Sequence, residues 1–212
     1  AGPLITAAVD AGATLSTHLG NGCASLLPRH DNVLWPQLAD DRLTASVIAD
    51  GWHLPQPVLQ SFLKCKTLER LLLTCDVSGF GGCPPGVYDS GNVQVEVLDD
   101  GRIVVAGQRQ YLAGSGATTG DCVAQLIDTC GLPLADAWDL AAEKPAALFA
   151  EPLCRLHAGQ QATLTVFHLP EQPAADRAAG AGPGNGPQPI RHTFQPVATL
   201  VRGRLAGGQL PQ

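Results

Sequence analysis

The hydrophobic pattern of the first third of the chain alternates between helical spacing and continuous apolar runs. Helical spacing is found at Leu4–Ala13, and VLWPQLADD and PQPVLQSFLKCK are also expected to form helices. Continuous apolar runs typical of strands cover Thr14–His18, Leu43–Asp50 and Glu69–Asp76. Strands that are apolar throughout are typical of sheets buried on both faces. The pattern therefore predicts βα units around a parallel sheet.

The pattern changes after Asp76. VSGFGGCPPGVYDSG predicts a glycine- and proline-rich loop, and residues 92–106 alternate around an Asp-Gly turn as in a β-hairpin. Helices are expected over TTGDCVAQLIDTCG and PLADAWDLAAEKPAALF, and strands over QQATLTVFHL and PVATLVRGRL. A stretch rich in Pro, Ala and Gly near 170–190 predicts a disordered loop. We therefore expect an α/β unit over 1–150, with a hairpin insertion near 92–106, and late strands within 151–212.

Composition excludes several classes of function. The net charge is −6, the isoelectric point is about 5.4, and no basic stripe is present, which argues against binding to nucleic acid. No stretch approaches the roughly 20 apolar residues of a membrane span. The seven cysteines are dispersed without a C-x-x-C pair, which predicts reduced thiols in a cytoplasmic protein. We expect neither a nucleic-acid partner nor a membrane partner.

Polar residues follow each of the three predicted parallel strands. His18 ends the first strand, His53 follows the second in ADGWH, and Asp76 ends the third. The carboxyl ends of parallel strands share one edge of the sheet, where the active sites of (β/α) barrels lie. Neutral imidazole suits zinc, and a nearby carboxylate can accept a proton from metal-bound water.

Each of these residues also has a structural interpretation. A histidine at a strand end is often only hydrogen-bonded to its surroundings, and an aspartate before a glycine-rich loop often forms an Asx turn. His53 could simply pack beside the indole of Trp52. The occurrence of such residues at three successive strand ends favours a shared site.

Four segments occur in an order that resembles the N-acetylglucosamine-6-phosphate deacetylases of the amidohydrolase superfamily. They are STHLGNG, VIADGWHL, LLLTCDVSG and YLAGSGATT, and the resemblance extends from Thr17 to about Phe167. It implies an α/β fold: the C-terminal part of a metal-dependent (β/α)8 TIM barrel, with strands of a small β-sandwich. The implied activity is hydrolysis of the linear amide of N-acetylglucosamine 6-phosphate, which yields glucosamine 6-phosphate and acetate in amino-sugar metabolism.

The resemblance also implies a role for each matching residue. His18 would bind a divalent metal, most simply Zn²⁺, and Asp76 would be the catalytic residue that activates water and protonates the departing amine. Arg29 would bind the phosphate, although LLPRHDN differs from the family's usual G-R-x-P-G. His53 would contact substrate, in some members across a homodimer interface, and we expect the full-length protein to be a homodimer. The implied substrate-binding residues are Asn21, Gly22, Arg29, His53, Leu112, Ala113, Gly114 and Ser115.

In that family, a glutamate and a further histidine that bind the metal precede the T-H-L segment. This chain begins instead with a predicted helix. We therefore expect the remaining metal ligands to lie upstream of Ala1, and the chain to be a fragment that is inactive alone. Two alternatives stay open: a non-catalytic amidohydrolase-like scaffold, and an amidohydrolase acting on another N-acyl or cyclic amide.

Overall fold

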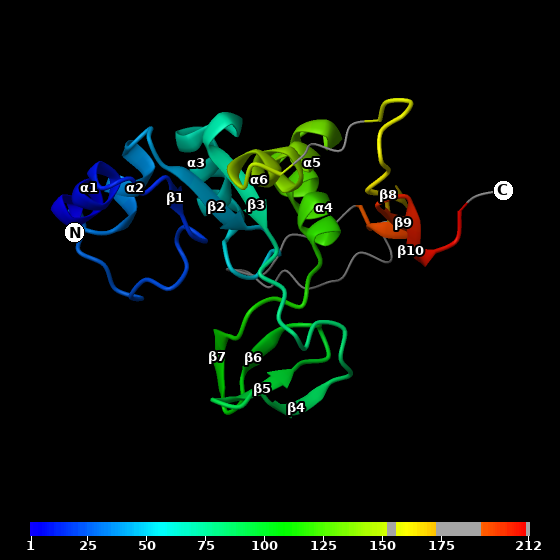
Figure 1. The fold of residues 1–212 in the computed structure, drawn as a ribbon. Coiled ribbons are helices and arrows are strands. Elements are labelled where there is room, and N and C mark those ends of the chain that lie inside the picture. Colours follow the sequence, from blue (N-terminus) through cyan, green and yellow to red (C-terminus); the bar gives the residue numbers. More distant parts are fainter. Residues whose placement is uncertain (152–155, 173–191, 211–212) are drawn as a thin grey trace.

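The computed structural model describes residues 1–151, 156–172 and 192–210. Its first sheet is parallel, with strand order β1-β2-β3, which confirms the predicted parallel pairing. The helices lie beside this sheet, and two antiparallel sheets follow it along the chain (Figure 1). The elements of the α/β unit are α1 (Gly2–Asp10), β1 (Leu15–Ser16), α2 (Leu34–Ala39), β2 (Thr44–Ile48), α3 (Gln56–Lys66), the 3-10 helix η1 (Leu68–Arg70), β3 (Leu71–Thr74), α4 (Thr119–Cys130), α5 (Leu134–Ala141) and α6 (Glu143–Leu148).

The main hydrophobic core lies between the parallel sheet and its helices. Val47 and Leu73 of the sheet pack in one cluster with Phe62 of α3, Leu126 of α4 and Leu140 of α5. All of these side chains are buried because each helix presents an apolar stripe to strands whose residues are mostly apolar. This core fixes the carboxyl ends of β1, β2 and β3 relative to one another.

The predicted strands are longer than the observed ones. The first ends at Ser16, because His18 takes a positive φ of 32° and leaves the extended conformation. The third begins only at Leu71, because η1 occupies the residues before it, and it ends before Asp76, whose φ is 53°. In both strands the candidate polar residue therefore lies in the loop after the strand.

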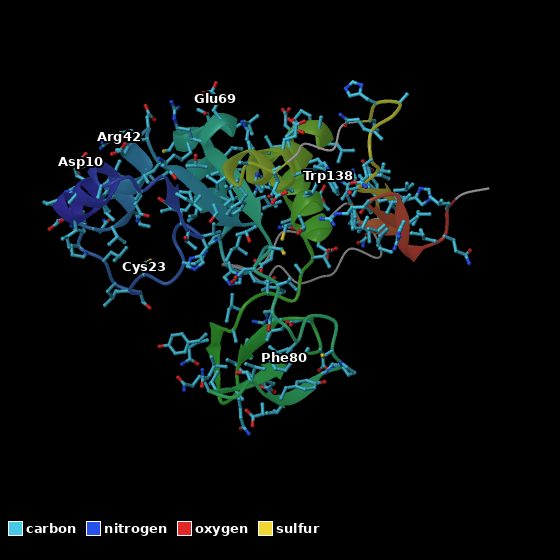
Figure 2. All side chains as sticks on the ribbon, in the orientation of Figure 1. Asp10, Cys23, Arg42, Glu69, Phe80 and Trp138 are labelled. Atoms are coloured by element: carbon cyan, nitrogen blue, oxygen red, sulfur yellow. The ribbon has the colours of Figure 1, made fainter. Side chains whose placement is uncertain are left out.

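A four-stranded antiparallel sheet occupies the region in which a loop and a hairpin were expected. Its order is β4-β5-β6-β7, and β5 and β6 form the hairpin within 92–106. The loop expected before the hairpin is wrong in part, because β4 pairs with β5 despite its glycine- and proline-rich surroundings. This sheet has a small core of its own, in which Phe80 packs against Tyr88. Phe80 lies in the lower part of the view in Figure 2. The strands are β4 (Gly86–Asp89), β5 (Gln94–Val97), β6 (Ile103–Val105) and β7 (Gln108–Leu112).

The last sheet has the order β10-β9-β8 and is antiparallel throughout. Its strands are β8 (Leu164–His168), β9 (Gln195–Val201) and β10 (Arg204–Gly208). The single strand expected over PVATLVRGRL is wrong, since Arg202 and Gly203 both adopt positive φ and turn the chain back on itself. Trp138 of α5 stacks on Phe167 at 4.9 Å between ring centroids, which joins this sheet to the helices. The loop predicted near 170–190 lies mostly outside the described residues.

The helix expected over Pro133–Phe149 is two helices. α5 ends at Ala141 and α6 begins at Glu143, with Ala142 between them at φ −125° and ψ −67°. Pro145 has no backbone N–H, so it cannot donate to the carbonyl of Ala141 as a continuous helix would require. The break follows from that missing donor.

Candidate functional site

The candidate residues gather along the carboxyl edge of the parallel sheet. His18 follows β1, His53 follows β2 and Asp76 follows β3, and these three strands are neighbours. The strand order thus places the three loops next to one another, as the pattern of strand ends predicted. A fourth segment, the loop after β7, also reaches this edge, because Ser115 pairs with Val77 in an isolated parallel bridge.

His18 is held by its backbone, and its ring atom Nδ1 makes no hydrogen bond within the described residues. Its N–H donates to the Ser46 hydroxyl at 2.6 Å, and the N–H of Leu19 donates to the Ser46 carbonyl at 2.8 Å. Three buried polar atoms of this segment make no hydrogen bond within the described part of the chain: Ser16 Oγ, His18 Nδ1 and Asn21 Nδ2. Buried polar atoms are seldom left without partners, so this loop is built to receive groups that the described residues do not supply.

Asp50 is the centre of the best-defined cluster at this edge. Its Oδ1 accepts from the backbone N–H groups of Trp52 and His53, both at 2.9 Å. Its Oδ2 lies 2.8 Å from His53 Nδ1 and accepts from the Ser115 hydroxyl at 2.8 Å. That hydroxyl in turn accepts from the N–H of Ala117 at 3.0 Å. Burial acts to raise the pKa of Asp50, but the hydrogen bonds from His53 outweigh it, so the pKa lies below its ordinary value.

Asp76 stands at the exposed end of this network. Its carbonyl accepts from the N–H of Ser115 at 2.8 Å, and the carbonyl of Ser115 accepts from Ser78 N–H at 2.8 Å. Gly114 has φ 78°, and a Cβ there would lie 3.2 Å from the Asp76 carbonyl and 3.1 Å from the Ser78 side chain. A glycine is therefore required where the two loops approach each other. The Asp76 carboxylate itself is in an exposed residue.

The expected substrate-binding segment 112–115 is anchored to the β4–β7 sheet. Leu112 ends β7, where it pairs with Val104, and the N–H of Ala113 donates to the Ile103 carbonyl at 2.9 Å. The Ser115 side chain is buried and makes its contacts inside the protein. In this segment the backbone, more than the side chains, faces the neighbouring loop.

Arg29 lies in the long loop between β1 and α2. It is exposed, and its carbonyl accepts from the Trp35 indole N–H at 3.0 Å, while Asn32 braces the loop through its own amide group. Asn21 and Gly22 line a pocket of about 410 Å³ between the start of this loop and α2. Neither Arg29 nor His18 lines that pocket. Among the described residues, no hydrogen bond or ion pair joins Arg29 to the other candidate residues.

The residues present fit a metal ion at one position only. A ligating imidazole nitrogen must be free of other partners, and His18 Nδ1 meets that condition. Within the described residues, no group of three or more His, Cys, Asp or Glu side chains is arranged to hold a metal ion. His18 can thus supply one ligand, and a complete set needs others from outside these residues.

Asp50 is the residue that sequence reasoning missed. It was placed at the end of a predicted strand, although it belongs to the quoted ADGWH segment. A charged residue at the end of an apolar run, three positions before a histidine, was the available signal. Its second partner, Ser115, is 65 residues further along the chain, so the sequence around Asp50 does not indicate this contact.

Comparison with known proteins shows that the chain is similar in sequence to amino-sugar-phosphate deacetylases. An N-acetylgalactosamine-6-phosphate deacetylase of Escherichia coli O157:H7 is 31% identical over 140 residues, which cover 66% of this chain and 36% of the relative. A protein of Escherichia coli (strain K12), provisionally named for the same activity, is 30% identical over 129 residues, which cover 61% of this chain and 75% of the relative. The chain belongs to the N-acetylglucosamine/N-acetylgalactosamine-6-phosphate deacetylase family.

The family also accounts for the fold. A solved N-acetylglucosamine-6-phosphate deacetylase of Mycobacterium smegmatis superposes with a TM-score of 0.75 at 28% identity, over 97% of this chain and 49% of that one. A variant of the same enzyme in complex with N-acetylglucosamine 6-phosphate gives a TM-score of 0.68 at 32% identity, over 77% of this chain and 43% of that one. This chain thus spans about a third of the first relative and about half of the solved deacetylase.

Two searches gave negative results. No protein-family model matches the sequence. None of the helices in the described residues is both long and apolar enough to cross a membrane.

Proposed function

We propose that this chain forms part of a metal-dependent amidohydrolase that removes the acetyl group from N-acetylglucosamine 6-phosphate. The observation that carries the proposal is the convergence of His18, His53 and Asp76 at one edge of a parallel sheet in a member of this deacetylase family. On this proposal, β1, β2 and β3 are strands of a (β/α)8 barrel, whose active site lies at the carboxyl ends of its strands. The β8–β10 sheet is then part of the small β-sandwich.

His18 would hold the metal through an unpartnered ring nitrogen, and the other ligands would come from outside the described residues. When bound, a divalent ion such as Zn²⁺ lowers the pKa of a water that it holds to about 7 and polarises the amide carbonyl. The Asp76 carboxylate accepts the proton of the attacking water and passes it to the amide nitrogen as the C–N bond breaks. The exposure of Asp76 leaves this carboxylate accessible to a substrate at the sheet edge.

The other candidate residues would bind the sugar and its phosphate. Arg29 is exposed, and no ion pair holds its guanidinium within the described residues, so it is available for bidentate contact with a phosphate. Asn21 and Gly22 line a pocket beside the same loop and would contact the sugar. His53 and the backbone of 112–115 would face the N-acetyl group from the neighbouring loops.

The test of the acid/base role is Asp76→Asn in the intact protein, assayed by acetate release. We expect kcat to fall by about 10²–10⁴-fold with the metal content unchanged, because an amide cannot accept and return the proton. Asp139→Asn on the exposed face of α5 is the matched control and should keep wild-type turnover. A kcat within a few-fold of the control would refute the assignment of Asp76.

The test of phosphate recognition is Arg29→Gln, with Arg204→Gln on β10 as the control for loss of an exposed guanidinium. We expect KM to rise for the 6-phosphorylated sugar and to stay unchanged for N-acetylglucosamine itself. An unchanged KM for the phosphorylated sugar would remove Arg29 from the site and favour an amidohydrolase of another N-acyl substrate.

A second candidate substrate is N-acetylgalactosamine 6-phosphate. Two of the relatives described above carry that sugar in their names, whereas the solved complex holds N-acetylglucosamine 6-phosphate. The two sugars differ only in the configuration at C4, so their kcat/KM ratio assigns the substrate directly. An intact protein that hydrolyses neither would be the non-catalytic scaffold or an amidohydrolase of another N-acyl or cyclic amide. The homodimer and the cytoplasmic location stay predictions, the former to be measured by the mass of the protein in solution.

A further inference from the structure

The Asp50 carboxylate joins two of the loops at the sheet edge directly, and a third through Ser115. It receives four hydrogen bonds, from Trp52 and His53 of its own loop and from Ser115 of the loop after β7. Ser115 also donates its backbone N–H to the Asp76 carbonyl, so the connection continues from the β2 loop to the β3 loop. The Asp50 side chain is only 2% exposed, which makes this a buried and fully bonded carboxylate.

The donors around Asp50 determine which nitrogen of His53 carries the proton. An ionised carboxylate can only accept hydrogen bonds, so a nitrogen 2.8 Å from Oδ2 must present an N–H to it. That nitrogen is Nδ1, and in the neutral ring Nε2 is then the acceptor. The Ser115 hydroxyl does not compete for this proton, since it accepts from Ala117 N–H and donates its own hydrogen to Asp50.

The β4–β7 sheet braces the same turn from a second side. The guanidinium of Arg102, which precedes β6, lies 4.6 Å from the centre of the Trp52 ring. The turn 50–53 is therefore held through Trp52 by the residue before β6 and through Asp50 by the loop after β7, which leave the same end of the sheet. Because these contacts come from different elements, the His53 ring has little freedom to rotate, and its side chain is 9% exposed.

We propose that Asp50 is a positioning residue, which holds His53 with Nδ1 protonated and Nε2 available as a hydrogen-bond acceptor for the substrate. A sugar hydroxyl or the amide N–H of the N-acetyl group is the donor that this acceptor fits. Ser115 serves the same arrangement by linking it to the loop that carries Asp76. The proposal rests on the function proposed above only for the identity of the substrate.

The decisive variant is Asp50→Asn in the protein labelled with ¹⁵N-histidine. The ring nitrogen shifts of His53, recorded about two pH units above the ordinary imidazole pKa of about 6.5, report its tautomer. We expect the Nδ1–H tautomer in the wild type. In Asp50→Asn we expect a shift toward Nε2–H, because the side-chain amide can present a donor to Nδ1. The kcat/KM for the 6-phosphorylated N-acetyl sugar should fall by about 10–100-fold.

The matched control is Asp128→Asn. Asp128 of α4 is a second buried carboxylate that contacts a histidine, with His192 Nδ1 at 2.6 Å from its Oδ1. Losing this pair costs stability without touching the candidate site, so the His53 tautomer and kcat/KM should match those of the wild type. Ser115→Ala should keep the Nδ1–H tautomer of His53 and reduce kcat/KM less than Asp50→Asn.

An Nε2–H tautomer in the wild type would overturn the proposal, whether or not Asp50→Asn folds. So would an Asp50→Asn protein that keeps Nδ1–H and the kcat/KM of Asp128→Asn. The tautomer measurement uses no substrate. An intact wild-type protein that fails to hydrolyse the sugar would therefore refute the proposed function, and the role of Asp50 would still be tested by the spectra.

Discussion

Replacing Gly120 by alanine tests how the late β sheet docks on the helices. Gly120 is buried in the first turn of α4, and a Cβ added there would overlap the ring of Phe194. If that ring moves away, it loses its packing on Trp138 at 5.9 Å and on Phe167 at 5.0 Å between centroids. The substitution therefore has two opposing effects on stability: alanine favours the helix, and its Cβ disrupts the aromatic cluster.

The magnitudes decide the sign of the effect. Helix propensity favours alanine over glycine by about 1 kcal/mol. Overpacking costs about 1–3 kcal/mol, and a ring that moves aside loses two aromatic contacts of about 0.5–1.5 kcal/mol each. The overpacking cost and the loss of aromatic contacts do not simply add, because movement of the ring relieves the overlap. We expect Gly120→Ala to lower the free energy of unfolding by about 1–3 kcal/mol.

The assay is urea unfolding followed by tryptophan fluorescence, because Trp138 lies in the affected cluster. Gly2→Ala in α1 is the matched control, since a Cβ there meets nothing within 4 Å. It should be neutral or stabilising by up to about 1 kcal/mol. Phe194→Leu combined with Gly120→Ala should cost less than the sum of the two single changes. A Gly120→Ala protein as stable as Gly2→Ala would refute the reasoning.

Two further predictions concern buried groups that are not candidate site residues. Lys66 is 1% exposed, and its ammonium donates to two backbone carbonyls at 2.7 and 2.9 Å. Lys66→Met should therefore destabilise the protein by about 1–3 kcal/mol in thermal unfolding. Lys64→Met, at an exposed position of the same helix, should change stability by less than about 0.5 kcal/mol, and equal losses would contradict this account. Burial raises the pKa of the Cys122 thiol, so iodoacetamide should modify exposed Cys65 in the native protein and leave Cys122 unmodified until denaturant is added, as peptide mass spectrometry would show.

Local sequence determined the elements whose signals are contained within a few residues. Thr118 and Asp121 cap α4 reciprocally, and Gly131 ends it with a left-handed φ of 68°. The apolar runs of β2 and β3 predicted a parallel pair buried on both faces, and the polar residues that follow them marked the edge where the candidate site lies. Periodicity, caps and strand ends are short-range properties, so the chain displays them without its fold.

Tertiary structure decided the features that depend on partners distant in sequence. β4 is a strand only because β5 lies beside it, and the glycines and prolines around it predict a loop. Asp50 became the centre of the candidate site through Ser115, which lies 65 positions away. Hydrogen bonds between distant segments form only when the core has brought their loops together, and they impose no spacing on the sequence. The same holds for the burial of Lys66, because the carbonyls that accept its hydrogen bonds belong to the loop before β2.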